Sequence, residues 1–218
     1  MTHRPYARTG ASVAWRVTRS ARLDAFARAG AIVLLVCFSV SLRASIARSG
    51  AIGGVTEGYL YGALWLGIAA VGRTRAGDRA DVLRGATDLR TAIPIGAIAG
   101  GVLLILPLVL HDPSPALRIG QGTAFWPWAA ATSLVAVAEE VVLRGVLWRW
   151  IAVAGGDVAA LIATSALFAL IHVPTYGPTI VPLDLAVGCY LGGLRLWFGN
   201  PGASAVAHLV ADLGTWWL

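Results

Sequence analysis

Two adjacent carboxylates in an otherwise apolar segment are the residues of this 218-residue sequence best placed to do chemistry. Glu139 and Glu140 lie in the run 129–143, where only Thr132 and Ser133 are otherwise polar. A carboxylate inside a membrane-spanning helix costs about 2.5 to 3.5 kcal/mol on insertion scales, and such residues usually mark a functional site. The pair therefore predicts a functional site within the membrane.

Two histidines and an aspartate are predicted to meet these carboxylates. His172 lies as far after the glycine pair at 155–156 as Glu139 lies before it, so an antiparallel helix hairpin places both at one depth. His208 and Asp212 are four residues apart and share one helical face. We expect these four side chains to line one cavity, in which an unpaired Glu139 facing a histidine can act as a general base.

Other polar residues have more ordinary interpretations. Glu140 and Arg144 are spaced by four with the acid first, the favourable order for an ion pair along a helix, and we interpret this pair as structural. Phe168 is interpreted as a packing residue that shapes the cavity, and Glu57 as a paired or hydrated residue near the outer interface. Each histidine, taken alone, has the alternative of a core residue hydrogen-bonded between helices.

The composition predicts the elements that hold these residues: 57% of residues are hydrophobic, 13% are charged, and the mean hydropathy is +0.73. Soluble domains carry about 25% charged residues. We predict an all-α, polytopic membrane bundle of about seven transmembrane helices, forming one domain over 29–218 after a basic arm at 1–28. The fifth helix is expected to end at Pro174. The predicted spans are 29–42, 50–71, 91–110, 126 or 129 to 153, 158–172, 183–198 and 204–218.

The charge pattern predicts orientation and partners. All 17 basic residues are arginines, which together with the excess of alanine, glycine and valine suggests a GC-rich bacterial coding sequence, and hence a bacterial plasma membrane. Most of the arginines fall in the arm and in connections that lie on one side of this layout, which predicts a cytoplasmic amino terminus. No groove-reading motif accompanies the net charge of +6, so we expect no nucleic-acid partner. The expected partners are the lipid bilayer and a membrane-associated peptide or protein. Residues 45–47 resemble a signal cleavage site, although Arg43 and the long leader argue against cleavage.

Three motifs in order resemble those of the CAAX-protease and bacteriocin-processing family of intramembrane proteases. Residues 139–144 (EEVVLR) are similar to EExxxR, residues 168–172 (FALIH) to FxxxH, and residues 208–212 (HLVAD) to HxxxN/D. The resemblance covers about 123–218, and the first hundred residues add only compatible spans.

This resemblance implies a glutamate-dependent endopeptidase. Glu139 and His172 would position and deprotonate a water, while His208 and Asp212 would stabilise the developing oxyanion. Many members have asparagine at position 212, so an aspartate there must be protonated or must orient His208. Glu139, His172 and His208 are also acceptable ligands for zinc or another divalent ion, and metal dependence stays open.

Two other classes of function remain open at this point. Acidic and histidine side chains inside a helix bundle also form proton relays, which leaves a proton-coupled carrier as an alternative. An internal repeat would favour that alternative, and none is evident. A non-catalytic family member that acts as a binding partner is the third possibility. Neither the substrate nor the oligomeric state follows from the sequence.

Overall fold

The computed structural model describes residues 18–73, 89–110 and 124–217, and within these ranges every regular element is a helix. Each of the seven predicted spans contains a helix there, so the predicted all-α bundle is confirmed. Most of the basic arm, the connection at 74–88 and the loop expected near 111–122 lie outside the described residues. The elements are α1 (Arg19–Ser49), α2 (Gly54–Gly72), α4 (Leu89–Leu110), α5 (Phe125–Glu140), the π-helix η2 (Val141–Leu147), α6 (Trp148–Gly155), α7 (Asp157–Tyr176), the 3-10 turn η3 (Pro178–Ile180), α8 (Val181–Phe198), α9 (Gly202–Gly214) and the 3-10 turn η4 (Thr215–Trp217).

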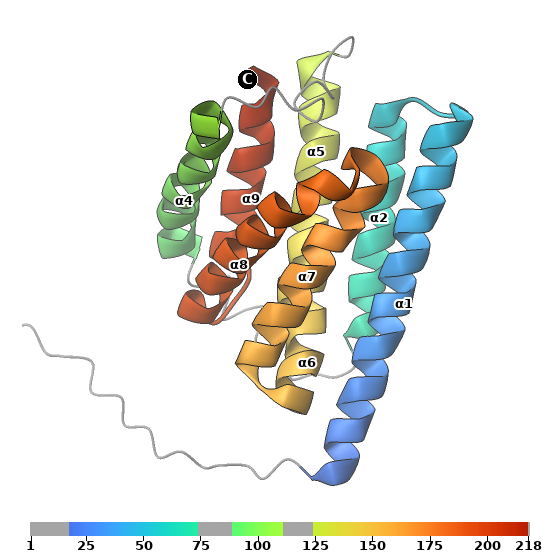
Figure 1. Cartoon of the computed structure of the whole chain (residues 1–218), viewed down its shortest axis with the longest axis vertical. Coiled ribbons are helices and arrows are strands. Elements are labelled where there is room, and N and C mark those ends of the chain that lie inside the picture. Colours follow the sequence, from blue (N-terminus) through green and yellow to red (C-terminus); the bar gives the residue numbers. More distant parts are fainter. Residues whose placement is uncertain (1–17, 74–88, 111–123, 218) are drawn as a thin grey trace, which may run out of the picture.

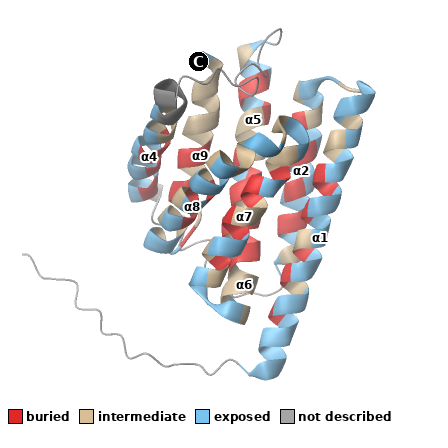
Figure 2. Cartoon of the chain, viewed as in Figure 1, coloured by how far each residue is buried: buried red, intermediate tan, exposed pale blue. Residues whose placement is uncertain are grey.

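The outer surface of the bundle is rich in exposed apolar side chains, and its largely apolar interior also encloses a few polar and charged ones. Large apolar side chains such as Leu34, Ile98 and Leu170 are exposed on the helix surfaces, whereas charged side chains are buried between the helices. Figure 2 shows the buried positions on the facing sides of the helices. Among the residues that the structure describes, three helical segments are long and apolar enough to cross a membrane: Arg19–Ser49, Asp157–Tyr176 and Pro178–Phe198. The protein is therefore a membrane protein whose outer surface suits lipid.

The long α5–η2–α6 segment occupies the middle of the bundle. Figure 1 shows α1 and α2 side by side on one flank, α4 and α9 on the other, and α7 and α8 across the front. α5 packs against α2 and α9, whereas its continuation into α6 packs against α1 and α7. Residues near the end of α5 are thereby surrounded by helices from both halves of the chain.

Small residues allow the flanking helices to approach one another closely. A side chain added at Gly96 or Gly100 of α4 would meet the carbonyl oxygens of Ala203 and Ala207 in α9, at 2.7 and 2.6 Å. In α2, Gly58 and Gly62 pack against α5, whereas Gly50 ends α1 in the left-handed region at φ 62°. The glycine spacing thus places α9, with its predicted site residues, tightly against α4.

Two helix boundaries differ from those expected. α1 begins at Arg19, inside the segment predicted as an arm. α7 continues through Pro174 to Tyr176, so the predicted end of the fifth helix is wrong. A proline in the last turn removes only one late backbone hydrogen bond, which the helix tolerates there.

Candidate active site

The two predicted carboxylates stand where the central helix changes its winding. Glu139 and Glu140 are the last residues of α5, and the π-helix η2 begins at the next residue. Both are buried, with 3% and 0% of their surface exposed. π-helical turns are rare in proteins, but those that occur are frequently found at functional sites. No feature of the hydrophobic pattern predicted this turn.

Of the two glutamates, Glu140 is the one held by contacts with other side chains. Its Oε1 accepts a hydrogen bond from Nη1 of Arg144 at 2.8 Å and faces Nδ1 of His208 at 3.2 Å. Arg144 also donates from Nη2 to the carbonyl oxygen of Gly188 at 3.1 Å. The predicted ion pair is therefore present, and it joins α5, α8 and α9 instead of serving one helix alone.

His208 lies between two carboxylates. Its Nδ1 faces Glu140, while its Nε2 is 3.5 Å from Oδ2 of Asp212, one turn further along α9. His208 is 5% exposed, whereas about a third of the Asp212 side chain is exposed. A ring with a proton on each nitrogen satisfies both acceptors at once. The shared helical face expected for these two residues is found.

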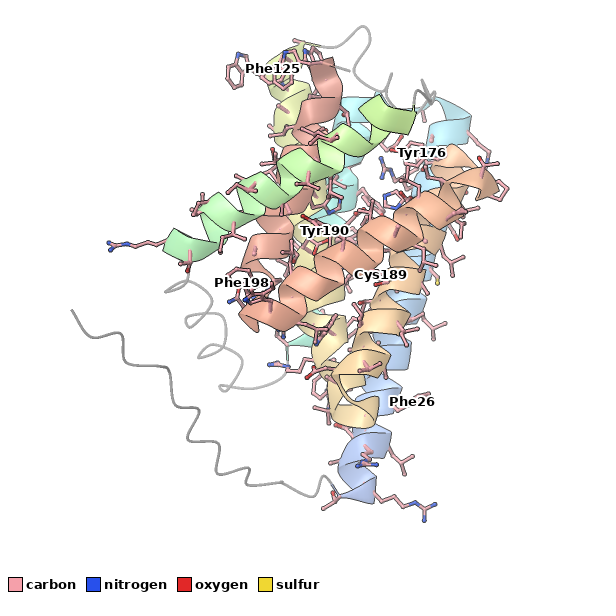
Figure 3. All side chains as sticks on the ribbon, turned by 60° about the vertical axis from the view of Figure 1, so that its left-hand side comes forward. Phe26, Phe125, Tyr176, Cys189, Tyr190 and Phe198 are labelled. Atoms are coloured by element: carbon pink, nitrogen blue, oxygen red, sulfur yellow. The ribbon has the colours of Figure 1, made fainter. Side chains whose placement is uncertain are left out.

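His172 is oriented by the backbone of its own helix. Its Nδ1 is 2.8 Å from the carbonyl oxygen of Phe168, and a carbonyl can only accept. Nδ1 therefore carries the proton of the neutral ring, and Nε2 keeps a free electron pair. Tyr176 stacks on the ring at 5.7 Å between centroids, and Figure 3 shows this tyrosine at the end of α7.

Phe168 contacts both imidazole rings. Its ring centroid lies 4.8 Å from that of His172 and 5.4 Å from that of His208, each in an edge-on arrangement. The guanidinium of Arg144 lies 4.7 Å from the same centroid. The phenylalanine is 3% exposed. One aromatic ring thus separates the two histidines and leaves their polar edges free to face elsewhere.

Glu139 has no hydrogen bond or ion pair within the described part of the chain. It interacts electrostatically with His208, Asp212 and Arg43. No hydrogen bond joins it directly to His172, although Arg43 and His208 interact electrostatically with that histidine as well. Glu139 is accordingly the carboxylate of this cluster that is left available to a bound molecule.

Residues from the first two helices also face the cluster, and the sequence did not indicate their role. Nε of Arg43 donates to Oε1 of Glu57 at 2.8 Å, and its guanidinium lies 4.5 Å from the Tyr61 ring. Both Arg43 and Tyr61 interact electrostatically with Glu139. The pairing expected for Glu57 is therefore present. One indication that such a residue could enter the bundle was available in the sequence, namely the position of Arg43 at the end of an apolar run.

The side chains that could hold a divalent ion are not grouped as a metal centre in the described part of the chain. Among the residues described, no three histidine, cysteine, aspartate or glutamate side chains are arranged to hold an ion. Nδ1 of His172 and both nitrogens of His208 are directed at protein oxygens instead. The side chains present thus do not fit the expected set of Glu139, His172 and His208, and the chemistry below uses the protein's own groups.

Comparison with known proteins shows that part of the chain matches a protein family. Residues 121–214 match the family described as type II CAAX prenyl endopeptidase Rce1-like. This part of the chain is similar to that family. The matched range contains all three motifs, so the resemblance based on them is confirmed there, and α1, α2 and α4 lie outside it. No curated protein and no solved structure matches the chain.

Proposed function

We propose that this chain is an intramembrane endopeptidase that hydrolyses a peptide bond in a membrane-associated peptide or protein. The supporting observation is the buried cluster in which His208 lies between Glu140 and Asp212, with the unbonded Glu139 beside it, inside the Rce1-like segment. Burying so many ionisable groups among apolar helices is costly and is typical of functional sites.

Glu139 is the general base in this proposal, because Glu140 is already engaged by two donors. Glu139 takes a proton from a water whose other contact is the free Nε2 of His172. The water oxygen forms a bond to the peptide carbonyl carbon, and the carbonyl electron pair moves to its oxygen. When the carbon–nitrogen bond breaks, the proton held by Glu139 passes to the leaving amine, which gives a new carboxyl group and a new amino group.

His208 is the oxyanion donor. Glu140 holds Nδ1 of the ring, which leaves the Nε2 proton to point toward the developing negative charge. Asp212 faces Nε2 at 3.5 Å and is partly exposed, so it orients the ring before the substrate carbonyl takes its place. An aspartate at this position thus acts through His208 and does not contact the oxyanion.

The surroundings of the cluster support a membrane-associated substrate. The lipid-facing surface and buried cluster favour a segment presented within or at the membrane. The Rce1-like family is described by cleavage of prenylated CAAX proteins, and maturation of a bacteriocin or signalling peptide is equally compatible with this site. We place the protein in a bacterial plasma membrane with its amino terminus in the cytoplasm, on the arginine distribution.

Cleavage of a peptide library by the purified protein in detergent tests the proposal. Wild type is expected to release new amino termini, whereas Glu139→Ala and His172→Ala are expected to lose activity by at least about 100-fold. Asp24→Asn, which removes an exposed acid paired only with Arg28, is the control and should match wild type. Equal cleavage by all four proteins would refute the assignment of these two residues.

A further inference from the structure

Asp184 is a partly buried acid that the proposed mechanism does not use. It lies in the first turn of α8, and its Oδ2 is sealed from solvent without a hydrogen bond. The nearest basic atom is Nδ1 of His172 at 3.3 Å, within ion-pair distance but without hydrogen-bond geometry. Leaving a buried carboxylate oxygen without a donor is costly, so the placement needs a compensating role.

The turn between α7 and α8 brings Asp184 to this histidine. Gly177 ends α7 at φ 83°, a left-handed conformation that glycine adopts without steric cost. Pro178 then opens the 3-10 turn η3, and Pro182 lies at the start of α8. The chain reverses within these few residues, so the first turn of α8 packs against the last turns of α7. Figure 1 shows the two helices meeting at this connection.

The other contact of Nδ1 carries no charge. The carbonyl oxygen of Phe168 is also the expected helical acceptor for the backbone N–H of His172, so the ring shares it. It fixes which nitrogen carries the proton, but it does not balance the partial positive charge that the ring gains when Nε2 accepts a hydrogen bond from the water. Among the described residues, the one carboxylate within ion-pair distance of His172 is that of Asp184.

We propose that Asp184 is a positioning residue for His172: its carboxylate holds the Nδ1 edge of the imidazole so that Nε2 stays directed at the reacting water. This inference rests on the proposed function for its kinetic effect. Carboxylates that orient metal-bound histidines typically contribute about 10- to 100-fold to metal affinity or activity, and we expect a similar effect on a histidine that binds the reacting water. Loss of the sole carboxylate partner of a catalytic histidine costs about 10⁴-fold in a serine protease, and the Phe168 carbonyl should keep the effect here smaller.

Steady-state kinetics on the full chain provide the first test. Asp184→Asn is expected to lower kcat by about 10- to 100-fold while KM stays within about twofold, and Asp184→Glu should recover part of the loss. Asp24→Asn is the matched control, because it makes the same change at an exposed acid. A kcat unchanged in Asp184→Asn, or a rise in KM that explains the whole effect, overturns the proposal.

Magnetic resonance of the histidine ring provides a second readout that does not require activity. The Nδ1–H proton of His172 should move upfield in Asp184→Asn and return toward the wild-type position in Asp184→Glu. Asp184→Ser also removes the charge and is the substitute if the asparagine variant does not fold. An unmoved resonance refutes the contact. A wild-type protein with no hydrolytic activity but with the expected shift refutes the proposed function and leaves the contact in place.

Discussion

The buried ion pair between Glu140 and Arg144 makes a quantitative prediction about stability. Both side chains are fully buried, and Nη1 lies 2.8 Å from Oε1. Arg144→Met removes this pair together with the hydrogen bond to the Gly188 carbonyl, and leaves the carboxylate without its one arginine partner, although His208 still faces it. Breaking a buried pair by removing one partner costs about 3–5 kcal/mol. We therefore expect the free energy of unfolding to fall by about that amount.

The measurement is denaturant unfolding of the purified protein in detergent, with Arg28→Met as the matched control. Arg28 and Asp24 have the same spacing and the same 2.8 Å distance, but their side chains are 38% and 58% exposed. An exposed pair contributes about 0–1 kcal/mol, and the stacking of Arg28 on Trp150 adds a similar amount. Equal losses in the two variants would contradict the claim that the inner pair is shielded from water.

Three further predictions concern packing and the oxyanion site. Gly188→Ala should lower the free energy of unfolding by about 1–3 kcal/mol, because the new Cβ would lie 3.0 Å from backbone atoms of α7. Gly193→Ala is the control, since a Cβ at Gly193 has no neighbour within 4 Å and should not lower it. Thermal unfolding of the two variants provides the comparison. Trp65→Phe should lose about 1 kcal/mol in the same assay, because Nε1 no longer donates to Oγ of Ser39 at 3.0 Å. Asp212→Asn should keep kcat within about tenfold of wild type, since an amide oxygen still orients the imidazole, and a total loss of cleavage would assign the aspartate a direct role.

The parts of the site that follow from helical periodicity were predictable from the sequence. The spacing of Glu140 and Arg144, and that of His208 and Asp212, places each pair on one helical face whatever the rest of the fold does. The apolar runs predicted the seven helices because membrane helices need long stretches of this kind. These inferences use only residues that are close together in the chain.

The contacts between helices were not predictable in the same way. The link from Glu140 to His208 and the approach of Asp184 to His172 depend on how α5, α8 and α9 cross, which no local pattern specifies. The π-helix after Glu140 likewise has no signature in the hydrophobic pattern. The position of Arg43 facing the cluster could not be predicted either, because it requires the packing of α1 and α2 to be known.

The most direct test of the central claim is whether Glu139 and His172 act on the same water. The values of kcat/KM for Glu139→Gln, His172→Gln and the double variant decide this, with Asp24→Asn as the control. Residues that act as a unit are not additive, so the double variant should be about as impaired as the worse single variant. Losses that multiply in the double variant, or full activity in either single one, would contradict the account.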